Sequence, residues 1–209
     1  MEKGYLRFLH VGCGLSRKEN TTPYFASDDW QEVRLDISPD ANPDIVDSIV
    51  GLSTVADNSY DAVFSSHNIE HVFAHEVGIT LGSFYRVLKE TGHLVILCPD
   101  LQLVAEHIAR GNLLEPLYVS PAGPIAPVDI LFGHRGSLSS GQYGMQHRMG
   151  FTQQALVNEL RHAGFQSVCH WRTPDRFELG AIASRAAMPD EELIEMAIRH
   201  FPQLEESLE

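Results

Sequence analysis

The sequence predicts an α/β fold built on a Rossmann-like, doubly wound and mostly parallel sheet. Two observations predict it. Short apolar runs alternate along the chain with segments of helical periodicity, which is the pattern of parallel strands joined by helices. Near the end of the chain two strand patterns follow each other closely, and this places an antiparallel strand at one edge of the sheet.

Length and composition suit one domain. The chain has 209 residues, and its 44% hydrophobic and 21% charged residues are ordinary for a soluble globular protein. We expect a single domain over residues 1–185, followed by a C-terminal helix within 186–209. Cys13, Cys98 and Cys169 are too scattered for a disulfide framework or a cysteine zinc site.

Charge and hydropathy argue against two kinds of partner. The formal net charge is -13, whereas nucleic-acid binding needs Lys and Arg to displace counterions from phosphate. No apolar run approaches the ~18 residues that span a membrane, and no signal-peptide pattern opens the sequence. We therefore expect a cytoplasmic monomer or homodimer that binds neither nucleic acid nor membrane.

Each strand expected in the first half ends at a turn or a polar residue. The first strand ends at the pair Gly12 and Gly14, and the second ends at Asp36 before a Ser-Pro-Asp turn. Strands are expected over 5–11, 32–37, 44–46, 61–65 and 93–99, with the two late ones around 166–171 and 178–184.

Apolar residues at helical spacing predict the helices. The longest is expected over 69–88, with Thr91 and Gly92 as its stop signal. Thr152 is the expected N-cap of another helix, and acids in the first turn of a final helix over 189–204 suit the helix dipole. A further helix over 101–111 opens a segment rich in Gly, Pro and Ser. Because so long a loop inside a domain is usually functional, we expect 101–150 to be a lid or binding-site insertion.

The glycine loop and two aspartates indicate a bound nucleotide. Ligands of open α/β sheets lie beyond the carboxyl ends of the strands, where glycines let the backbone approach them. A dinucleotide fingerprint needs a third glycine, but Arg17 stands there. Asp36 lies about 20 residues after the glycine loop, where an acidic residue contacts ribose hydroxyls. Asp47, after the third strand, is placed to accept from an adenine amino group.

Successive motifs resemble those of class I S-adenosylmethionine-dependent methyltransferases of the small-molecule kind. The motifs are "LHVGCG", "VRLDI", "ADNSYDAVFSSHNIEHV" and "YRVLKETGHLVILCPDL", and they cover about residues 5–101. The later "GFTQQALVNELRHAGFQSV" resembles the next helix and strand of that family. One departure is the family's first helix, which is poorly formed after Gly14 because the stretch has a proline and weak periodicity.

The resemblance implies S-adenosylmethionine as cofactor and a role for each matching position. Gly12 and Gly14 contact the amino-acid part, Asp36 holds the ribose hydroxyls, and Ser66 and His67 lie beside the methionine moiety. The full set of implied cofactor residues is Gly12, Cys13, Gly14, Asp36, Ile37, Asp47, Ser48, Ser66 and His67.

The acceptor is expected to be a small molecule, anionic or sugar-like. A protonated acceptor needs a base, and histidine suits that work near neutral pH. We expect His71, His134 or His147 to supply it. Arginine grips carboxylate or phosphate, so the expected substrate contacts are Arg135, Tyr143 and Arg148.

His67, His71 and His75 recur at helical spacing and raise the question of a metal. A histidine stripe is more often a partly solvated helix face, and Glu70-His71 recurs in the resembled family without metal. We therefore expect no metal.

Three other functions were weighed. A methyltransferase-fold protein that binds the cofactor without catalysis, as a regulatory or assembly module, retains the same cofactor residues. An NAD-dependent oxidoreductase is disfavoured by Arg17, and nucleic-acid methylation is disfavoured by the net charge.

Overall fold

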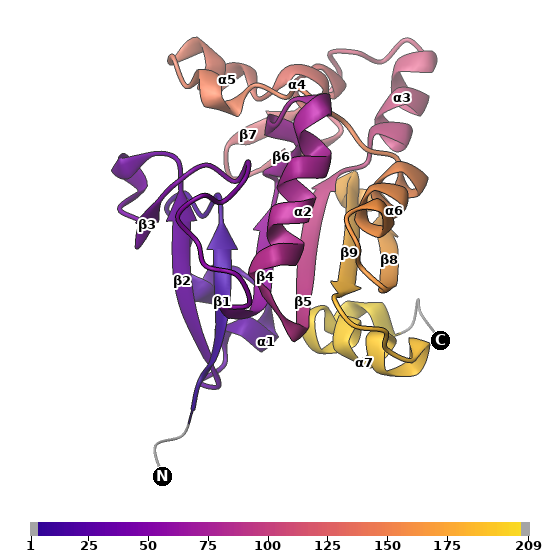
Figure 1. The fold of residues 1–209 in the computed structure, drawn as a ribbon. Coiled ribbons are helices and arrows are strands. Elements are labelled where there is room, and N and C mark those ends of the chain that lie inside the picture. The colour runs from indigo at the N-terminus through magenta and orange to yellow at the C-terminus, as the bar shows by residue number, and fades with distance from the viewer. Residues whose placement is uncertain (1–3, 206–209) are drawn as a thin grey trace.

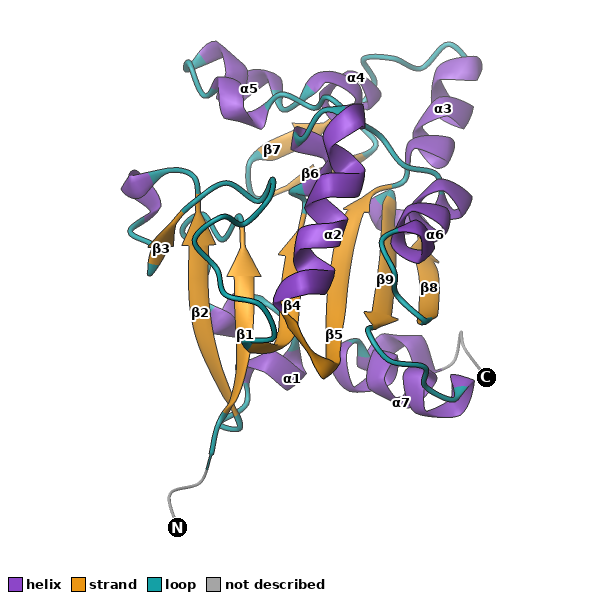
Figure 2. Cartoon of the chain, in the orientation of Figure 1, coloured by secondary structure: helices purple, strands orange, loops and turns teal. Residues whose placement is uncertain are grey.

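A seven-stranded sheet organises the computed structural model, which describes residues 4–205 (Figures 1 and 2). The strand order is β3-β2-β1-β4-β5-β9-β8. The strands are β1 (Leu6–Val11), β2 (Trp30–Asp36), β3 (Ile45–Val46), β4 (Tyr60–Ser66), β5 (Leu88–Pro99), β8 (Ser167–Thr173) and β9 (Glu178–Ser184).

The sheet is mostly parallel, as the sequence predicts. Strands β1 to β5 run parallel to one another, with Val11 opposite Leu35 on one side and Ser65 on the other. Strand β9 runs antiparallel to β5, and the edge strand β8 pairs antiparallel with β9. The prediction of a Rossmann-like sheet with antiparallel pairing at one edge is therefore confirmed.

Helices cover both faces of the sheet, which defines a doubly wound fold. One face packs against α2 (Val77–Val87) and α6 (Gln153–His162), and the other against α1 (Pro23–Ala26) and α7 (Asp190–His200) (Figure 2). Thr152 caps α6 by accepting from Ala155 N, as predicted. The poor first helix is also confirmed, because α1 has only four residues. No helix within residues 4–205 has the length and apolar character needed to cross a membrane.

The single long helix expected over 69–88 is wrong. Two 3-10 turns, η3 (Ile69–His71) and η4 (Ala74–Glu76), precede α2. Val72 and Phe73 are extended between them, and Glu76 accepts from the backbone of Phe73 at 2.9 Å. His67, His71 and His75 therefore do not form one helical stripe.

The expected helix stop at Gly92 is likewise wrong, since α2 passes directly into β5. Gly92 lies inside that strand, where a Cβ atom would sit 2.9 Å from the carbonyl oxygen of Lys89. Close packing, and not helix capping, explains the glycine at this position.

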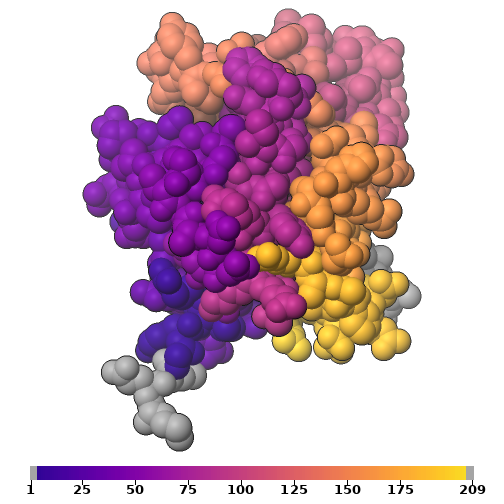
Figure 3. Space-filling model, viewed as in Figure 1, coloured from indigo at the N-terminus to yellow at the C-terminus, as the bar shows by residue number. Residues whose placement is uncertain are grey.

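The segment between β5 and α6 is more ordered than its composition predicts. It has a small core of its own around Val104, Ile125 and Ile130, and it forms the end of the molecule opposite α7 (Figure 3). Its elements are α3 (Leu101–Ala109), a hairpin of β6 (Tyr118–Ser120) and β7 (Gly123–Ile125), α4 (Pro127–Phe132), α5 (Arg135–Ser139) and η5 (Tyr143–Met145). The remaining 3-10 turns are η1 (Lys18–Asn20), η2 (Pro39–Ala41), η6 (Pro174–Arg176) and η7 (Pro202–Leu204).

Two buried histidines join α7 to the sheet. The Nε2 atoms of His93 and His200 lie 3.1 Å apart, and Nδ1 of His200 lies 2.8 Å from the hydroxyl of Thr22. One hydrogen can occupy the space between the two Nε2 atoms, so the two rings cannot both be protonated. Burial lowers the pKa of His93 to about 4, and burial together with His93 lowers that of His200 to about 2.

This pair makes the fold sensitive to acid. In the unfolded chain both rings take up protons near pH 6.5, whereas the folded rings do so only near pH 4 and below. The free energy of unfolding is therefore expected to fall as the pH drops below ~6.5, by up to about 1.4 kcal/mol per pH unit for each ring. Urea unfolding at pH 7 and pH 5 measures the loss. In His93→Gln and in His200→Gln the loss should be smaller than in the wild type, and equal losses in all three proteins would refute the assignment.

Candidate functional site

The residues predicted to bind a nucleotide gather at one edge of the sheet. The chain leaves β1 toward β2 on one side, while β4 and β5 extend the sheet on the other. The carboxyl ends of β1 and β4 thus flank the point where the strand order reverses, which is where open α/β sheets bind ligands. The loop at Gly12 follows β1, and His67 follows β4.

The two glycines of the loop are required for different reasons. Both adopt positive φ, +56° at Gly12 and +50° at Gly14. A Cβ atom on Gly12 would overlap the side-chain amide of Asn68, which donates to the carbonyl of Val11 at 2.8 Å. A Cβ atom on Gly14 would meet nothing within 4 Å among the described residues. The loop therefore packs against the β4 side at Gly12 and opens at Gly14.

Arg34 holds the glycine loop through hydrogen bonds to its backbone, a role that was not predicted from the sequence. It is 2% exposed in the middle of β2. Its guanidinium donates to the carbonyl oxygens of Gly14, Ser16, Ala41 and Asn42, which belong to the loops after β1 and β2. The signal in the sequence is an arginine inside the apolar strand pattern "VRLDI".

Asp36 links the glycine loop to the end of β2. One carboxylate oxygen accepts from Gly14 N and the other from Ser38 N, each at 2.8 Å. Each oxygen keeps a second acceptor position. Leu15 and Ile37 beside them are 84% and 72% exposed, so apolar surface flanks the carboxylate. This combination can hold a ribose and an aromatic base.

Asp47 lies next to Asp36 but is used locally. Its backbone N–H donates to the carbonyl of Asp36, and its carboxylate accepts from Ser48 N and from both the N–H and the hydroxyl of Thr54. Burial opposes ionisation, but these hydrogen bonds lower the pKa of Asp47. The carboxylate therefore shapes the turn after β3, and the role predicted for it toward adenine stays a prediction.

Cys13 between the glycines is an inert thiol. It is 3% exposed, and burial raises its pKa to about 11. The residue contributes packing and backbone to the loop.

His67 carries a positive charge at the end of β4. It has a left-handed φ of +53°, and its ring lies between two buried carboxylates, 2.9 Å from Glu178 and 3.4 Å from Glu70. Burial opposes protonation, but the hydrogen bonds to Glu178 and Glu70 outweigh it and raise the pKa of His67 to about 10. The side chain is still 45% exposed, so this imidazolium faces the site.

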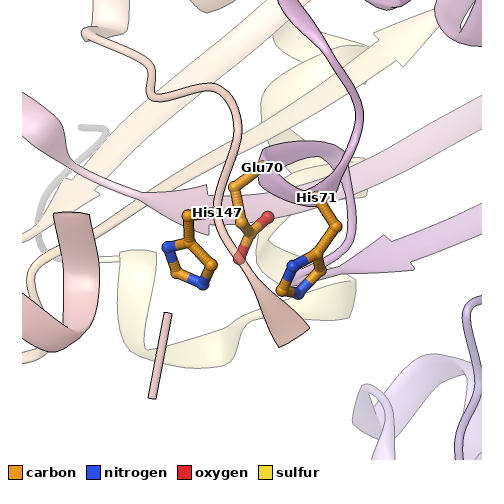
Figure 4. A group of neighbouring side chains, drawn as sticks. All are labelled: Glu70, His71 and His147. Carbon is orange, nitrogen blue, oxygen red and sulfur yellow. The ribbon is translucent and has the colours of Figure 1, made fainter. Parts of the chain in front are cut away.

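The insertion brings His147 to His71 and Glu70. The ring centroids of His71 and His147 are 4.9 Å apart, and the carboxylate of Glu70 lies between the two rings (Figure 4). The carbonyl of Glu70 accepts from Arg148 N at 2.8 Å and Met149 N at 3.1 Å, so the backbone fixes this arrangement. Sequence reasoning named the two histidines but gave no role to Glu70, although it stands beside His71 in the motif.

A cavity of about 140 Å³ opens over this group. It lies between the end of β4 and the insertion, and its polar lining comes from His67, Glu70, His71, Tyr118, Asp129, His134 and His147. A larger cavity of about 290 Å³ between α6 and β8 contains none of the predicted site residues.

The other residues predicted for the acceptor differ in their position. His134 lines the cavity, but its Nδ1 accepts from Ser137 N and caps α5. Arg135 grips Asp129 through Nε at 2.7 Å and Nη2 at 2.9 Å. Burial opposes the ionisation of Asp129, but Arg135 and the backbone lower its pKa to about 2.

Tyr143 and Arg148 lie outside the lining of the cavity. Tyr143 is 73% exposed on η5. The guanidinium of Arg148 stacks over the ring of Phe73 at 4.6 Å and donates to the carbonyl of His71. The structure therefore brings His71, His134 and His147 together but not the three predicted substrate contacts.

Comparison with known proteins shows what the sequence and the fold are similar to. Residues 9–96 match the family model described as a methyltransferase domain. A solved S-adenosylmethionine-dependent methyltransferase from Mesorhizobium loti is 19% identical, covering 88% of this chain and 93% of that one with a TM-score of 0.59. A methyltransferase of Burkholderia thailandensis that acts at N1 of 1,6-didemethyltoxoflavin, solved with S-adenosylhomocysteine, is 15% identical, covering 88% and 72% with a TM-score of 0.51.

A possible exported protein from Bordetella parapertussis is also similar, with 20% identity and a TM-score of 0.54. The match covers 88% of this chain but only 64% of that one. Comparison with curated protein sequences gives no match.

The fold and the matched segment show which proteins this chain is similar to. The chain has the fold of the class I S-adenosylmethionine-dependent methyltransferases. Its residues 9–96 match the family model of a methyltransferase domain, in agreement with the resemblance stated from the motifs.

The glycine geometry gives a testable difference. Positive φ costs an alanine roughly 1–2 kcal/mol, so Gly14→Ala should lower the free energy of unfolding by about that amount. Gly12→Ala has the same backbone cost and also displaces Asn68, so its loss should be larger. Thermal or urea unfolding of the two variants compares them directly. A larger loss in Gly14→Ala would show that the loop packs differently.

Proposed function

We propose that this protein transfers a methyl group from S-adenosylmethionine to a small-molecule acceptor. The observation that carries the proposal is the joint position of the glycine loop, Asp36 and the histidine-lined cavity around one reversal of strand order. Cofactor and acceptor would then meet at the carboxyl ends of β1 and β4. The formal net charge of the protein is -13, which disfavours a nucleic-acid acceptor.

The cofactor is proposed to lie along the ends of β1, β2 and β3. Its ribose hydroxyls would use the free acceptor positions of Asp36, and its adenine would pack on the exposed Ile37 near Asp47 and Ser48. The amino-acid part would lie over Gly12, Cys13 and Gly14. Ser66 and the imidazolium of His67 would face it from the end of β4, where a positive charge suits the carboxylate of methionine.

The acceptor is proposed to enter the cavity over Glu70, His71 and His147. When bound, S-adenosylmethionine would supply the methyl group and leave as S-adenosylhomocysteine, and the cavity residues would hold the heteroatom of the acceptor in line with the sulfur–methyl bond. The protein aligns the two reactants and excludes water. A hydroxyl acceptor must also lose its proton, and activation would occur at the group formed by Glu70, His71 and His147.

The contacts of the other predicted acceptor residues suit them to different roles. His134 uses its Nδ1 lone pair as a helix cap, so it would offer Nε2–H to the acceptor as a hydrogen-bond donor. Arg135 is held by Asp129, and both Tyr143 and Arg148 lie outside the lining of the cavity, so none of the three is proposed to orient the substrate there.

Asp36 provides the test of the cofactor position. Asp36→Asn replaces a charged acceptor by an amide, and hydrogen bonds to charged groups contribute ~1.5–3 kcal/mol. Calorimetry should show S-adenosylhomocysteine binding weakened by roughly 10–100-fold. The matched control is Asp28→Asn, an exposed aspartate before the opposite end of β2, which should bind like the wild type. Unchanged affinity in Asp36→Asn would refute the assignment of the ribose site.

His147 provides the test of the acceptor side. Tritiated S-adenosylmethionine and a panel of small hydroxyl, amine and carboxylate compounds identify an acceptor. With that acceptor, His147→Gln should lower kcat by at least about 100-fold while the affinity for S-adenosylhomocysteine stays unchanged. The exposed His75 is outside the cavity, so His75→Gln is the control. Full turnover by His147→Gln would place activation elsewhere.

A further inference from the structure

We propose that Glu70, His71 and His147 bind a divalent transition-metal ion of the zinc type at the floor of the cavity. One ligand atom from each residue can be chosen so that all three lie within 4.8 Å of one another. Two imidazoles and one carboxylate form a ligand set that zinc uses when it keeps an open position. Binding of the metal follows from these residues alone, whereas its part in activating an acceptor rests on the proposed function.

The carboxylate of Glu70 has an unused oxygen. The residue is 1% exposed, and its Oε1 lies 3.4 Å from His67 Nδ1. Its Oε2 has no hydrogen-bond partner within residues 4–205. A buried carboxylate oxygen without a partner is costly, so native proteins pair it or give it to a metal. A cation between the rings in Figure 4 would satisfy this oxygen.

Both histidines are held in the tautomer that binds metal through Nε2. Nδ1 of His71 lies 3.1 Å from the carbonyl oxygen of Gln146, and Nδ1 of His147 lies 2.6 Å from that of Ile130. A carbonyl only accepts, so each Nδ1 carries the hydrogen and each Nε2 keeps its lone pair. Backbone carbonyls fix metal-binding histidines in this way.

The backbone holds the three ligands together across a long stretch of chain. Glu70 and His71 lie on η3, directly after β4, and His147 comes from the returning end of the insertion. Arg148 N and Met149 N donate to the carbonyl of Glu70 at 2.8 and 3.1 Å. Two segments 77 positions apart are thus aligned before any ion binds, so little ordering is left for binding to accomplish.

The surroundings favour a cation and leave room for a further ligand. Glu178 is hydrogen-bonded to His67 and Asp129 is paired with Arg135, so Oε2 of Glu70 is the carboxylate oxygen left for a cation. The cavity of about 140 Å³ reaches the same residues, so a water molecule or an acceptor oxygen can complete the coordination. This proposal replaces the expectation of no metal, which concerned a helical stripe that the chain does not form.

The test is metal binding by the full chain without an affinity tag. Protein stripped with a chelator and dialysed is titrated with zinc by calorimetry, and cobalt(II) reports ligand binding through its visible absorption bands. We expect one zinc per chain in the wild type. His71→Gln and His147→Gln should each weaken binding by at least ~10–100-fold, because even outer partners of a metal contribute that much. His75→Gln should bind zinc like the wild type.

The outcomes separate this proposal from the proposed function. The metal site is overturned if the wild type does not bind zinc. It is also overturned if His71→Gln and His147→Gln bind zinc as tightly as the wild type. Tighter binding of magnesium than of zinc also overturns it, since magnesium prefers oxygen ligands. S-adenosylhomocysteine is titrated into the same samples and depends on other residues. If S-adenosylhomocysteine binds and zinc does not, the metal site alone is refuted. If zinc binds and S-adenosylhomocysteine does not, the metal site is supported and the proposed cofactor is refuted.

Discussion

The buried guanidinium of Arg34 is the constraint on which the cofactor edge depends. A charge removed from water must have its donors satisfied, and Arg34 satisfies them with carbonyls of the loops after β1 and β2. Asp36 also joins the same two loops, because its carboxylate accepts a hydrogen bond from Gly14 N. Both loops are therefore held in one geometry before a ligand binds, so binding costs little conformational entropy in these loops. The proposed cofactor would lie against the open side of Gly14 and the exposed Ile37.

A second buried charge organises the acceptor side. Glu70 is shielded from water, with the imidazolium of His67 beside it and the rings of His71 and His147 on either side of its carboxylate. Its backbone carbonyl anchors the returning end of the insertion. The position of the insertion over the sheet is thereby coupled to the chemistry of the cavity. A shift of that segment would move His147, so the packing of the insertion and the proposed activation of an acceptor would depend on the same contacts.

Much of the fold could be predicted from the sequence, because strand patterns and turns are local signals. The glycine loop, Asp36 and the capping by Thr152 are of this kind. The start of α2 could not be predicted, because two 3-10 turns carry the same apolar spacing as a helix. The contacts of His147 with Ile130 and of Arg148 with Glu70 link distant positions, and no local pattern encodes them. The predicted substrate role of Arg135 did not anticipate its pairing with Asp129, six positions earlier.

The central claim is that this edge binds S-adenosylmethionine and not a dinucleotide. Calorimetric titration of the full chain with S-adenosylhomocysteine and, separately, with NAD tests it most directly. Our account predicts one bound S-adenosylhomocysteine per chain and no binding of NAD, since Arg17 replaces the third glycine of a dinucleotide loop. Binding of NAD without binding of S-adenosylhomocysteine would contradict it.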